Sequence, residues 1–420
     1  MTKIERPGLL WEKDLFDTIP VWEYEPDLDI ISKVVQETLG LSSGECKVSF
    51  LDAGAINRVY AVQVKDEKNK YIMRLSLPLD PKNKTASEVA THKWLRNTNI
   101  PVPEIIAFDD SNKNPIGYEW ILMQYMLGQC LYNKWRKIPW EDKIALVKRV
   151  AECQLELMKS TFKTIGSFRE TETAIEPGHC VTPYFTVGDC FDYDVPRGPF
   201  NCSRDWIEAR AEILIHDHKE CIKKVENDED DEYDEEDLED FKAYLHTAER
   251  LAETAPLVFS EGSECTVLQH MDLSLRNMMV DENNQLCGII DWEFALTVPL
   301  WAASKVPKFL KDRKRNEKPD PDDYRPPEPD AEDNDDLDGE GKCSLYWEHL
   351  MEYETTQLRK IYKNYMGERL CSSDVRENGR VKNDFIRAID DCSIGFCISR
   401  IEGWLDEIEK GNFVRYKRIG

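Results

Sequence analysis

Short apolar runs with a two-residue period fill the first third of the chain. They are rich in β-branched and aromatic side chains and are separated by polar turns, which predicts strands. The expected strands are residues 48–51, 59–64, 71–75, 105–108 and 120–123. A helical period at residues 87–96 separates the third strand from the fourth. We therefore expect a small lobe, residues 45–126, with a five-stranded antiparallel sheet and one helix.

A helical period governs most of the chain after Gly128. The helices expected there are residues 140–158, 241–252, 344–365 and 383–408, the last broken near Gly395. Residues 278–280 and 286–290 predict a strand hairpin within this region. Residues 1–44 predict an extension with one amphipathic helix at 26–39. The whole pattern predicts an α+β protein of two lobes, in which residues 127–420 form the larger, mainly helical lobe.

The formal charge of −26 is concentrated in two tracts. Residues 226–240 hold twelve acids and no base, and residues 319–341 hold eleven acids and one base, which leaves −4 for the rest of the chain. We expect both tracts to be disordered insertions, because they are too polar to bury. The remainder has no basic surface tract for nucleic acid. No apolar run is long enough to span a membrane, and thirteen scattered cysteines favour a reducing, cytoplasmic location.

The strongest chemical signal is His-x-Asp-x-x-x-x-Asn at residues 270–277, followed by an apolar strand that ends in Asp291, fourteen residues after Asn277. Phosphoryl transfer from a magnesium nucleotide needs a carboxylate to orient the hydroxyl acceptor, and hard oxygens to hold the metal. Asp272 is the candidate catalytic base, and Asn277 and Asp291 are the candidate Mg²⁺ ligands. His270 completes the catalytic loop, and we expect it to support that loop by hydrogen bonding.

These motifs resemble those of the aminoglycoside phosphotransferase and choline kinase-like family, especially its uncharacterised fungal branch. The resemblance implies a protein kinase-like fold, ATP as the phosphoryl donor, and a small-molecule hydroxyl acceptor. It also implies a nucleotide-covering turn at residues 51–60, a phosphate-binding side chain on the third strand with its ion-pair partner on the following helix, and an inter-lobe hinge. The residues that it assigns to the nucleotide are Gly54, Asn57, Arg74, Glu88, Gln124 and Met126.

Two features of the sequence keep a second hypothesis open. The covering turn has a single glycine, Gly54, and Arg74 stands where the family usually has lysine. The chain is therefore a small-molecule kinase or, alternatively, a kinase-fold module that binds a partner without catalysis. A protein kinase is disfavoured because no Ala-Pro-Glu element follows Asp291. Glu293 is expected to pin the loop after Asp291, with a metal-ligand role as the alternative.

Overall fold

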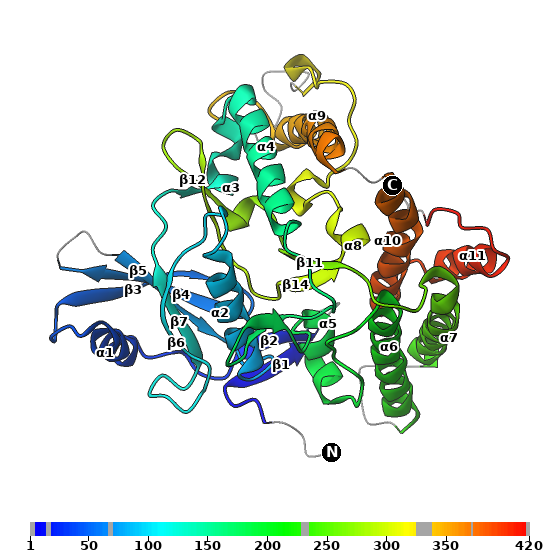
Figure 1. Ribbon diagram of the computed structural model, residues 1–420, viewed down its shortest axis with the longest axis horizontal. Helices are drawn as coiled ribbons and strands as arrows, with labels where there is room; N and C mark the ends of the chain where they lie inside the picture. The colour runs from blue at the N-terminus through cyan, green and yellow to red at the C-terminus, as the bar shows by residue number, and fades with distance from the viewer. Residues whose placement is uncertain are drawn as a thin grey trace, which may run out of the picture.

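The computed structural model describes residues 5–13, 18–65, 70–227, 235–324, 338–370 and 373–416, without the side chains of residues 13, 235–236 and 373–378. Within these ranges the chain forms a small sheet-containing lobe and a larger helical lobe (Figure 1). The predicted α+β, two-lobed architecture is confirmed.

The small lobe is built on one antiparallel sheet with the strand order β3-β4-β5-β7-β6. Its strands are β3 (Cys46–Ala53), β4 (Asn57–Val64), β5 (Lys70–Ser76), β6 (Ile105–Asp109) and β7 (Glu119–Gln124). Helix α1 (Leu28–Leu39) packs Ile31 and Val35 against one face, and α2 (Asn83–Leu95) contacts β6 and β7. All five strands and both helices stand where the hydrophobic pattern predicts them.

The start of the chain adds a hairpin that the sequence did not predict. Strands β1 (Leu9–Lys13) and β2 (Thr18–Trp22) pair with each other, and Trp22 packs edge-on against Tyr118 with 4.5 Å between ring centroids. The Arg6 guanidinium donates hydrogen bonds to the carbonyl oxygens of Thr186 and Gly188, both at 3.0 Å. The extension therefore joins the small lobe to the helical lobe.

The helical lobe has two groups of packed helices (Figure 1). Helix α4 (Trp140–Leu157) packs on α9 (Ser344–Arg369), and α6 (Ser203–Glu226) packs on α7 (Glu235–Val258). Helices α10 (Ser373–Ser393) and α11 (Ile398–Glu409) complete the second group, with the predicted break at Gly395, whose φ is +63°. Shorter helices are α3 (Leu131–Lys134), α5 (Pro183–Thr186) and α8 (Leu300–Ala303), and the 3₁₀ turns are Trp135–Lys137, Gly188–Asp192, Leu275–Asn277, Lys308–Leu310 and Pro321–Tyr324.

Small strand pairs lie between these helices. The predicted hairpin is present as β12 (Met278–Val280) and β13 (Leu286–Ile289), with β8 (Gln129–Cys130) beside β12. Strand β11 (Thr266–Gln269) pairs with β14 (Leu296–Pro299), and β9 (Phe168–Glu170) pairs with β10 (Ile175–Pro177). The sequence did not predict the last four or β8, because runs of two to four residues are too short to show a strand period.

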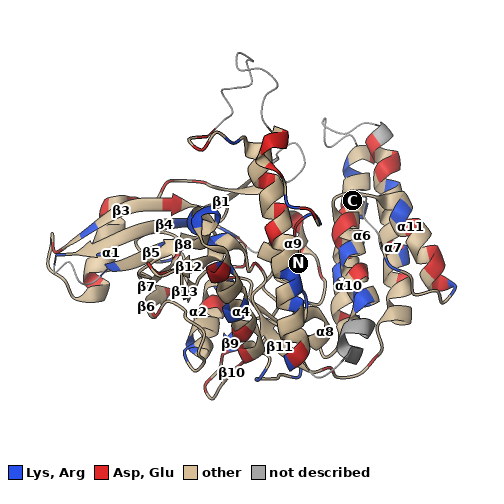
Figure 2. Ribbon diagram, turned by 90° about the horizontal axis from the view of Figure 1, so that it is seen from above, with Lys and Arg blue, Asp and Glu red and all other residues tan. Residues whose placement is uncertain are grey.

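The acidic tracts are partly ordered, which corrects the expectation of disorder for their edges. Residues 235–240 form the start of α7, residues 321–324 form a 3₁₀ turn, and Asp338 accepts a 2.8 Å hydrogen bond from the Trp347 indole. Residues 228–234 and 325–337 lie outside the described residues. Elsewhere acidic and basic positions are interspersed along the helices (Figure 2). Among the described helices, none is both long and apolar enough to cross a membrane.

Candidate active site

Two neighbouring strand pairs hold the catalytic motif. The β11–β14 pair and the β12–β13 pair bracket the loop at residues 270–277 and the segment at residues 290–295. The Ile290 amide donates to the Asn277 carbonyl at 2.9 Å, which extends the β12–β13 ladder by one step. Asn277 therefore stands directly beside Asp291, as the predicted hairpin requires.

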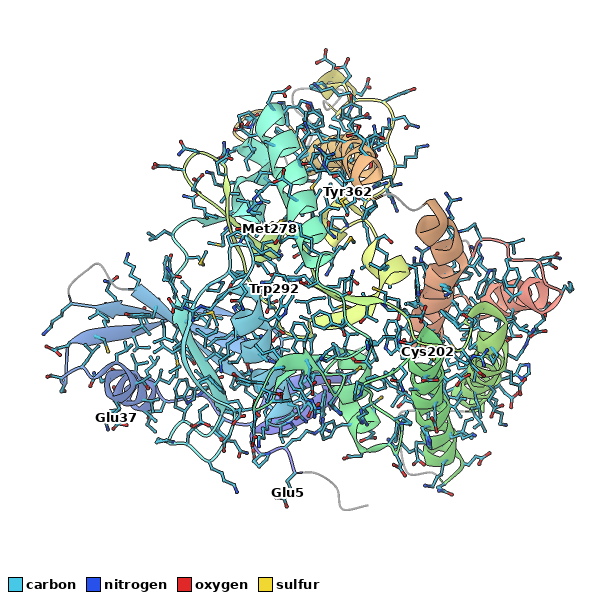
Figure 3. The ribbon with its side chains drawn as sticks, viewed as in Figure 1. Glu5, Glu37, Cys202, Met278, Trp292 and Tyr362 are labelled. Atoms are coloured by element: carbon cyan, nitrogen blue, oxygen red, sulfur yellow. The ribbon has the colours of Figure 1, made fainter. Side chains whose placement is uncertain are left out.

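His270 fixes the catalytic loop from inside. Its Nε2–H donates to the Ile290 carbonyl at 3.0 Å, and its Nδ1 accepts from the Asp272 amide at 3.2 Å, so both ring nitrogens are occupied. Burial lowers the pKa of His270, which keeps the ring neutral. The ring meets Trp292 edge-on at 4.6 Å, and Trp292 lies at the junction of the lobes (Figure 3). His270 thus makes hydrogen bonds of the kind expected for a residue that supports the loop.

Asp272 presents one carboxylate oxygen outward. Its backbone carbonyl accepts from the Asn277 side-chain amide and from the Ser274 amide, both at 2.9 Å, which fixes the loop around it. Its Oδ1 is covered and lies 2.9 Å from the Lys308 ammonium, yet the side chain as a whole is 46% exposed. The open oxygen is therefore Oδ2, which is available to a hydroxyl group. Nothing in the sequence pattern singles out Lys308 as a neighbour of this carboxylate.

Asn277 and Asp291 offer hard oxygen atoms side by side. The Asn277 amide nitrogen is used within the loop, which leaves its side-chain carbonyl. Asp291 has a φ of +63° and a side chain that is 34% exposed. Burial and the nearby Glu293 carboxylate raise the pKa of Asp291 against the opposing effect of Arg74, so this position favours an added cation. Two oxygen ligands completed by phosphates and water suit Mg²⁺.

Arg74 connects helix α2 with the Asp291 segment. The expected ion pair between Arg74 on β5 and Glu88 on α2 is present, and both side chains are buried. The second guanidinium nitrogen, Nη1, lies 3.5 Å from Asp291 Oδ1, while Nε is buried without a hydrogen-bond partner. The structure thus brings a residue assigned to the nucleotide phosphates next to a residue assigned to the metal.

A second buried cluster, which the sequence analysis missed, lies beside the first. Lys84 on α2 is 2.8 Å from Glu293 and donates to Asn57 Oδ1 at 3.3 Å and to Ser76 Oγ at 3.2 Å. Asn57 also donates to Glu293 at 2.8 Å and accepts from Ser76 at 2.7 Å. Asn57 therefore joins the lobes, and its contact with nucleotide stays a prediction. Glu293 pins the loop, as expected. Lys84 was not singled out because its partner Glu293 is distant in the chain.

The covering turn and the hinge have backbone features that bear on nucleotide access. Gly54 lies in the exposed turn between β3 and β4, with open space around the position of a Cβ. At the hinge the Gln124 amide donates to the Glu104 carbonyl at 2.8 Å, so this amide is already used within the protein. The Cβ of a larger residue at Gly128 would lie 2.8 Å from the Val280 carbonyl, so the approach of β12 requires glycine there. The contacts of Gly54, Gln124 and Met126 with nucleotide remain predictions.

Curated relatives of this chain are fungal. A subtelomeric hrmA-associated cluster protein of Aspergillus fumigatus strain Af293 is 24% identical over 308 residues, which cover 62% of this chain and 60% of that protein. Altered inheritance of mitochondria protein 9, mitochondrial, of Yarrowia lipolytica is 27% identical over 211 residues, covering 42% of this chain and 36% of that protein. The chain spans less than two thirds of the length of these relatives.

The chain is also similar, at low sequence identity, to several solved structures. The GDP and kanamycin complex of APH(2")-IIia has a TM-score of 0.43 and 16% identity, covering 92% of this chain and all of that one. The ethanolamine kinase of Plasmodium vivax has a TM-score of 0.42 and 16% identity, covering 88% and 89%.

The sequence profile of the phosphotransferase enzyme family matches residues 47–302, which is more than half of the chain and includes every candidate site residue. This match confirms the predicted family, whose members the motifs resemble. The chain belongs to the phosphotransferase enzyme family.

Proposed function

We propose that this protein transfers the γ-phosphoryl group of ATP to a hydroxyl group of a small molecule. Asp272 orients the acceptor hydroxyl and accepts its proton as the new oxygen–phosphorus bond forms and ADP departs. Arg74 binds phosphate oxygens, and the backbone of Gln124 and Met126 meets adenine. Asn277 and Asp291 hold Mg²⁺, which neutralises charge on the phosphates.

One observation carries this proposal more than any other. Arg74 Nη1 lies 3.5 Å from Asp291 Oδ1, and Asn277 stands next to Asp291 in the β-ladder. Arg74, for which we propose phosphate binding, therefore lies close to Asp291 and Asn277, for which we propose metal binding, and Asn277 is hydrogen-bonded to the backbone of Asp272. Structural ion pairing alone explains Arg74 with Glu88, but it does not require a second, partly exposed carboxylate, Asp291, whose pKa is raised.

The first test measures nucleotide binding by thermal unfolding. Mg²⁺–ATP at millimolar concentration is expected to raise the Tm by several degrees, because a ligand that binds only the folded state stabilises it. Asp291→Ala should remove this rise. Glu37→Gln on the outer face of α1 changes the charge far from the site (Figure 3) and should keep it. The proposal is contradicted if Mg²⁺–ATP does not change the Tm of the wild-type protein.

The second candidate function is a kinase-fold module that binds a partner without catalysis. It is favoured by the single glycine of the covering turn and by the presence of arginine, where the family usually has lysine, at position 74. ATP turnover measured over a panel of amino alcohols, sugars, aminoglycosides and hydroxy acids separates the two functions. Turnover that is lost in Asp272→Asn supports the kinase, whereas nucleotide binding without turnover of any acceptor supports the module.

A further inference from the structure

The 3₁₀ turn at Lys308–Leu310 is fixed against the catalytic loop. The Phe309 amide donates a hydrogen bond to the Leu273 carbonyl at 3.2 Å. Phe309 and Leu310 are buried, and both pack into the same hydrophobic core as Leu273. Because Leu273 directly follows Asp272, the backbone of Lys308 keeps a set position relative to the candidate catalytic base.

The Lys308 side chain extends from this turn to the catalytic carboxylate. Its ammonium nitrogen is 2.9 Å from Asp272 Oδ1, and the two side chains are 64% and 46% exposed. Ion pairs between side chains this exposed contribute little to the stability of a fold. The flexible stem of lysine also allows the ammonium to move while the turn stays in place. The chemistry at Asp272 therefore explains the position of this ammonium better than the stability of the fold does.

The other cations of the site are engaged differently. Arg74 and Lys84 are each paired with a glutamate whose side chain is at most 11% exposed. Arg276, the arginine of the catalytic loop, lies over the Tyr132 ring, with its guanidinium carbon 4.1 Å from the ring centroid. Lys308 differs from these three, because its partner is the carboxylate that would take up a proton during the reaction.

Asp272 can serve Lys308 and an acceptor at the same time. Its Oδ1 faces the ammonium, and its Oδ2 is open to a hydroxyl group. A hydroxyl group at Oδ2 would lie about 3 Å from that oxygen, and the phosphorus atom that it attacks would lie about 3 to 3.5 Å farther on. The transferring phosphoryl group would therefore lie within reach of the Lys308 side chain.

We propose that Lys308 is a catalytic residue that binds the transferring phosphoryl group while Asp272 takes the acceptor proton. This inference rests on the proposed function and deepens it. The O–H bond of the acceptor breaks, a bond forms between its oxygen and the γ-phosphorus, and the bond from that phosphorus to ADP breaks. The proton moves to Asp272, which becomes neutral and attracts the ammonium less. Negative charge is then spread over the oxygens of the transferred group, and Lys308 turns to them.

Thermal unfolding with a mimic of the transferring group tests the proposal without a known acceptor. The mimic is aluminium fluoride, added to Mg²⁺–ADP. We expect Mg²⁺–ADP to raise the Tm of the wild-type protein and aluminium fluoride to raise it further, because sites that catalyse a transfer bind such mimics tightly. Lys308→Gln should keep the first rise and lose the second. Lys308→Arg should keep part of the second, because guanidinium retains the charge with a different geometry.

Steady-state ATP hydrolysis, in which water takes the place of the acceptor hydroxyl, is the second measurement. Lys308→Gln should lower kcat by roughly a hundredfold, the usual effect of removing one group that stabilises charge in a transition state. Its KM for ATP should not change, since Lys308 does not hold the nucleotide. Lys314→Gln is the matched control, because it removes another exposed lysine of the same segment. This control should match the wild-type protein in both measurements.

Two results would overturn the role of Lys308 while leaving the proposed function in place. The first is a full additional rise with aluminium fluoride in Lys308→Gln. The second is a kcat of this variant that equals or exceeds the wild-type value, which would mean that Lys308 only occupies Asp272 until the acceptor arrives. If Mg²⁺–ADP does not change the Tm of the wild-type protein, the proposed function itself fails, and the role of Lys308 fails with it.

Discussion

Two cation–carboxylate links run side by side from the small lobe to the segment after β13, and they differ in solvent access. Lys84 and Glu293 form a closed link, with side chains 1% and 11% exposed, and Asn57 and Ser76 complete its hydrogen bonds. Arg74 and Asp291 form an open link at 3.5 Å, with Asp291 34% exposed. The difference in solvent access suggests different roles. The closed link holds the two lobes together, whereas the carboxylate of the open link is still accessible to a ligand.

The pKa shifts of the two carboxyl groups agree with the difference between the closed and the open link. Burial favours the protonated form of Glu293, but Lys84 and Arg74 outweigh it and lower the pKa of this carboxyl. For Asp291, burial and the charge of Glu293 prevail over Arg74, and its pKa is raised. The pKa values of two carboxylates two residues apart are thus shifted in opposite directions, because the cations of the protein compensate Glu293 more fully than Asp291.

The largest expected effect is on stability and comes from the closed link. Lys84→Met leaves Glu293 buried without its cation, which should lower the free energy of unfolding by about 3 to 5 kcal/mol. Urea unfolding followed by circular dichroism measures this loss.

Two further variants show whether that loss belongs to the closed link. Lys93→Met removes an exposed lysine from the same helix and should cost less than about 1 kcal/mol. Lys84→Met combined with Glu293→Met should recover much of the stability, since no buried charge is left unpaired. If the double variant is as unstable as the single one, packing rather than charge explains the role of Lys84.

The open link should behave in the opposite way. Asp291→Asn removes a carboxylate whose pKa is raised by folding, so the variant should be more stable at pH 8, by about 1 to 2 kcal/mol after solvent screening. Mg²⁺–ATP should no longer raise its Tm.

The stability that Asp291→Asn gains should depend on pH, because folding raises the pKa of the Asp291 carboxyl. Near pH 4 the folded carboxyl is protonated and the difference between Asp291→Asn and wild type is small. It should grow as the pH rises toward 7, because the unfolded state ionises first, and then stay constant. Thermal unfolding of both proteins from pH 4 to pH 9 measures the difference. If Asp291→Asn is less stable than wild type at pH 8, the Asp291 carboxylate stabilises the fold, as Glu293 does.

The contrast also shows what the sequence could predict. The two-lobed α+β fold and the Asn277–Asp291 neighbourhood followed from local period and from motif spacing, because short-range rules place them. The Arg74–Glu88 pair was implied by the resemblance to the family. Lys84 and Lys308 were missed because their partners, Glu293 and Asp272, are distant in the chain. The assignment of Asn57 to the nucleotide came from its position in a turn, whereas its side chain faces the other lobe. Contacts between lobes depend on packing that a single sequence does not display.

The smallest expected effect tests whether the closed link acts as one hydrogen-bonded unit. Ser76→Ala removes a hydroxyl that donates to Asn57 at 2.7 Å and accepts from Lys84 at 3.2 Å, but it leaves the Lys84–Glu293 pair in place. The loss should be about 1 kcal/mol, the usual net worth of a hydrogen bond. Ser43→Ala in the exposed turn after α1 is the control and should change stability by less than about 0.5 kcal/mol. Because Arg74 and Asp291 are untouched, the Tm rise with Mg²⁺–ATP should be preserved in Ser76→Ala. A reduced rise would mean that the two links are coupled and that the closed one also positions the nucleotide.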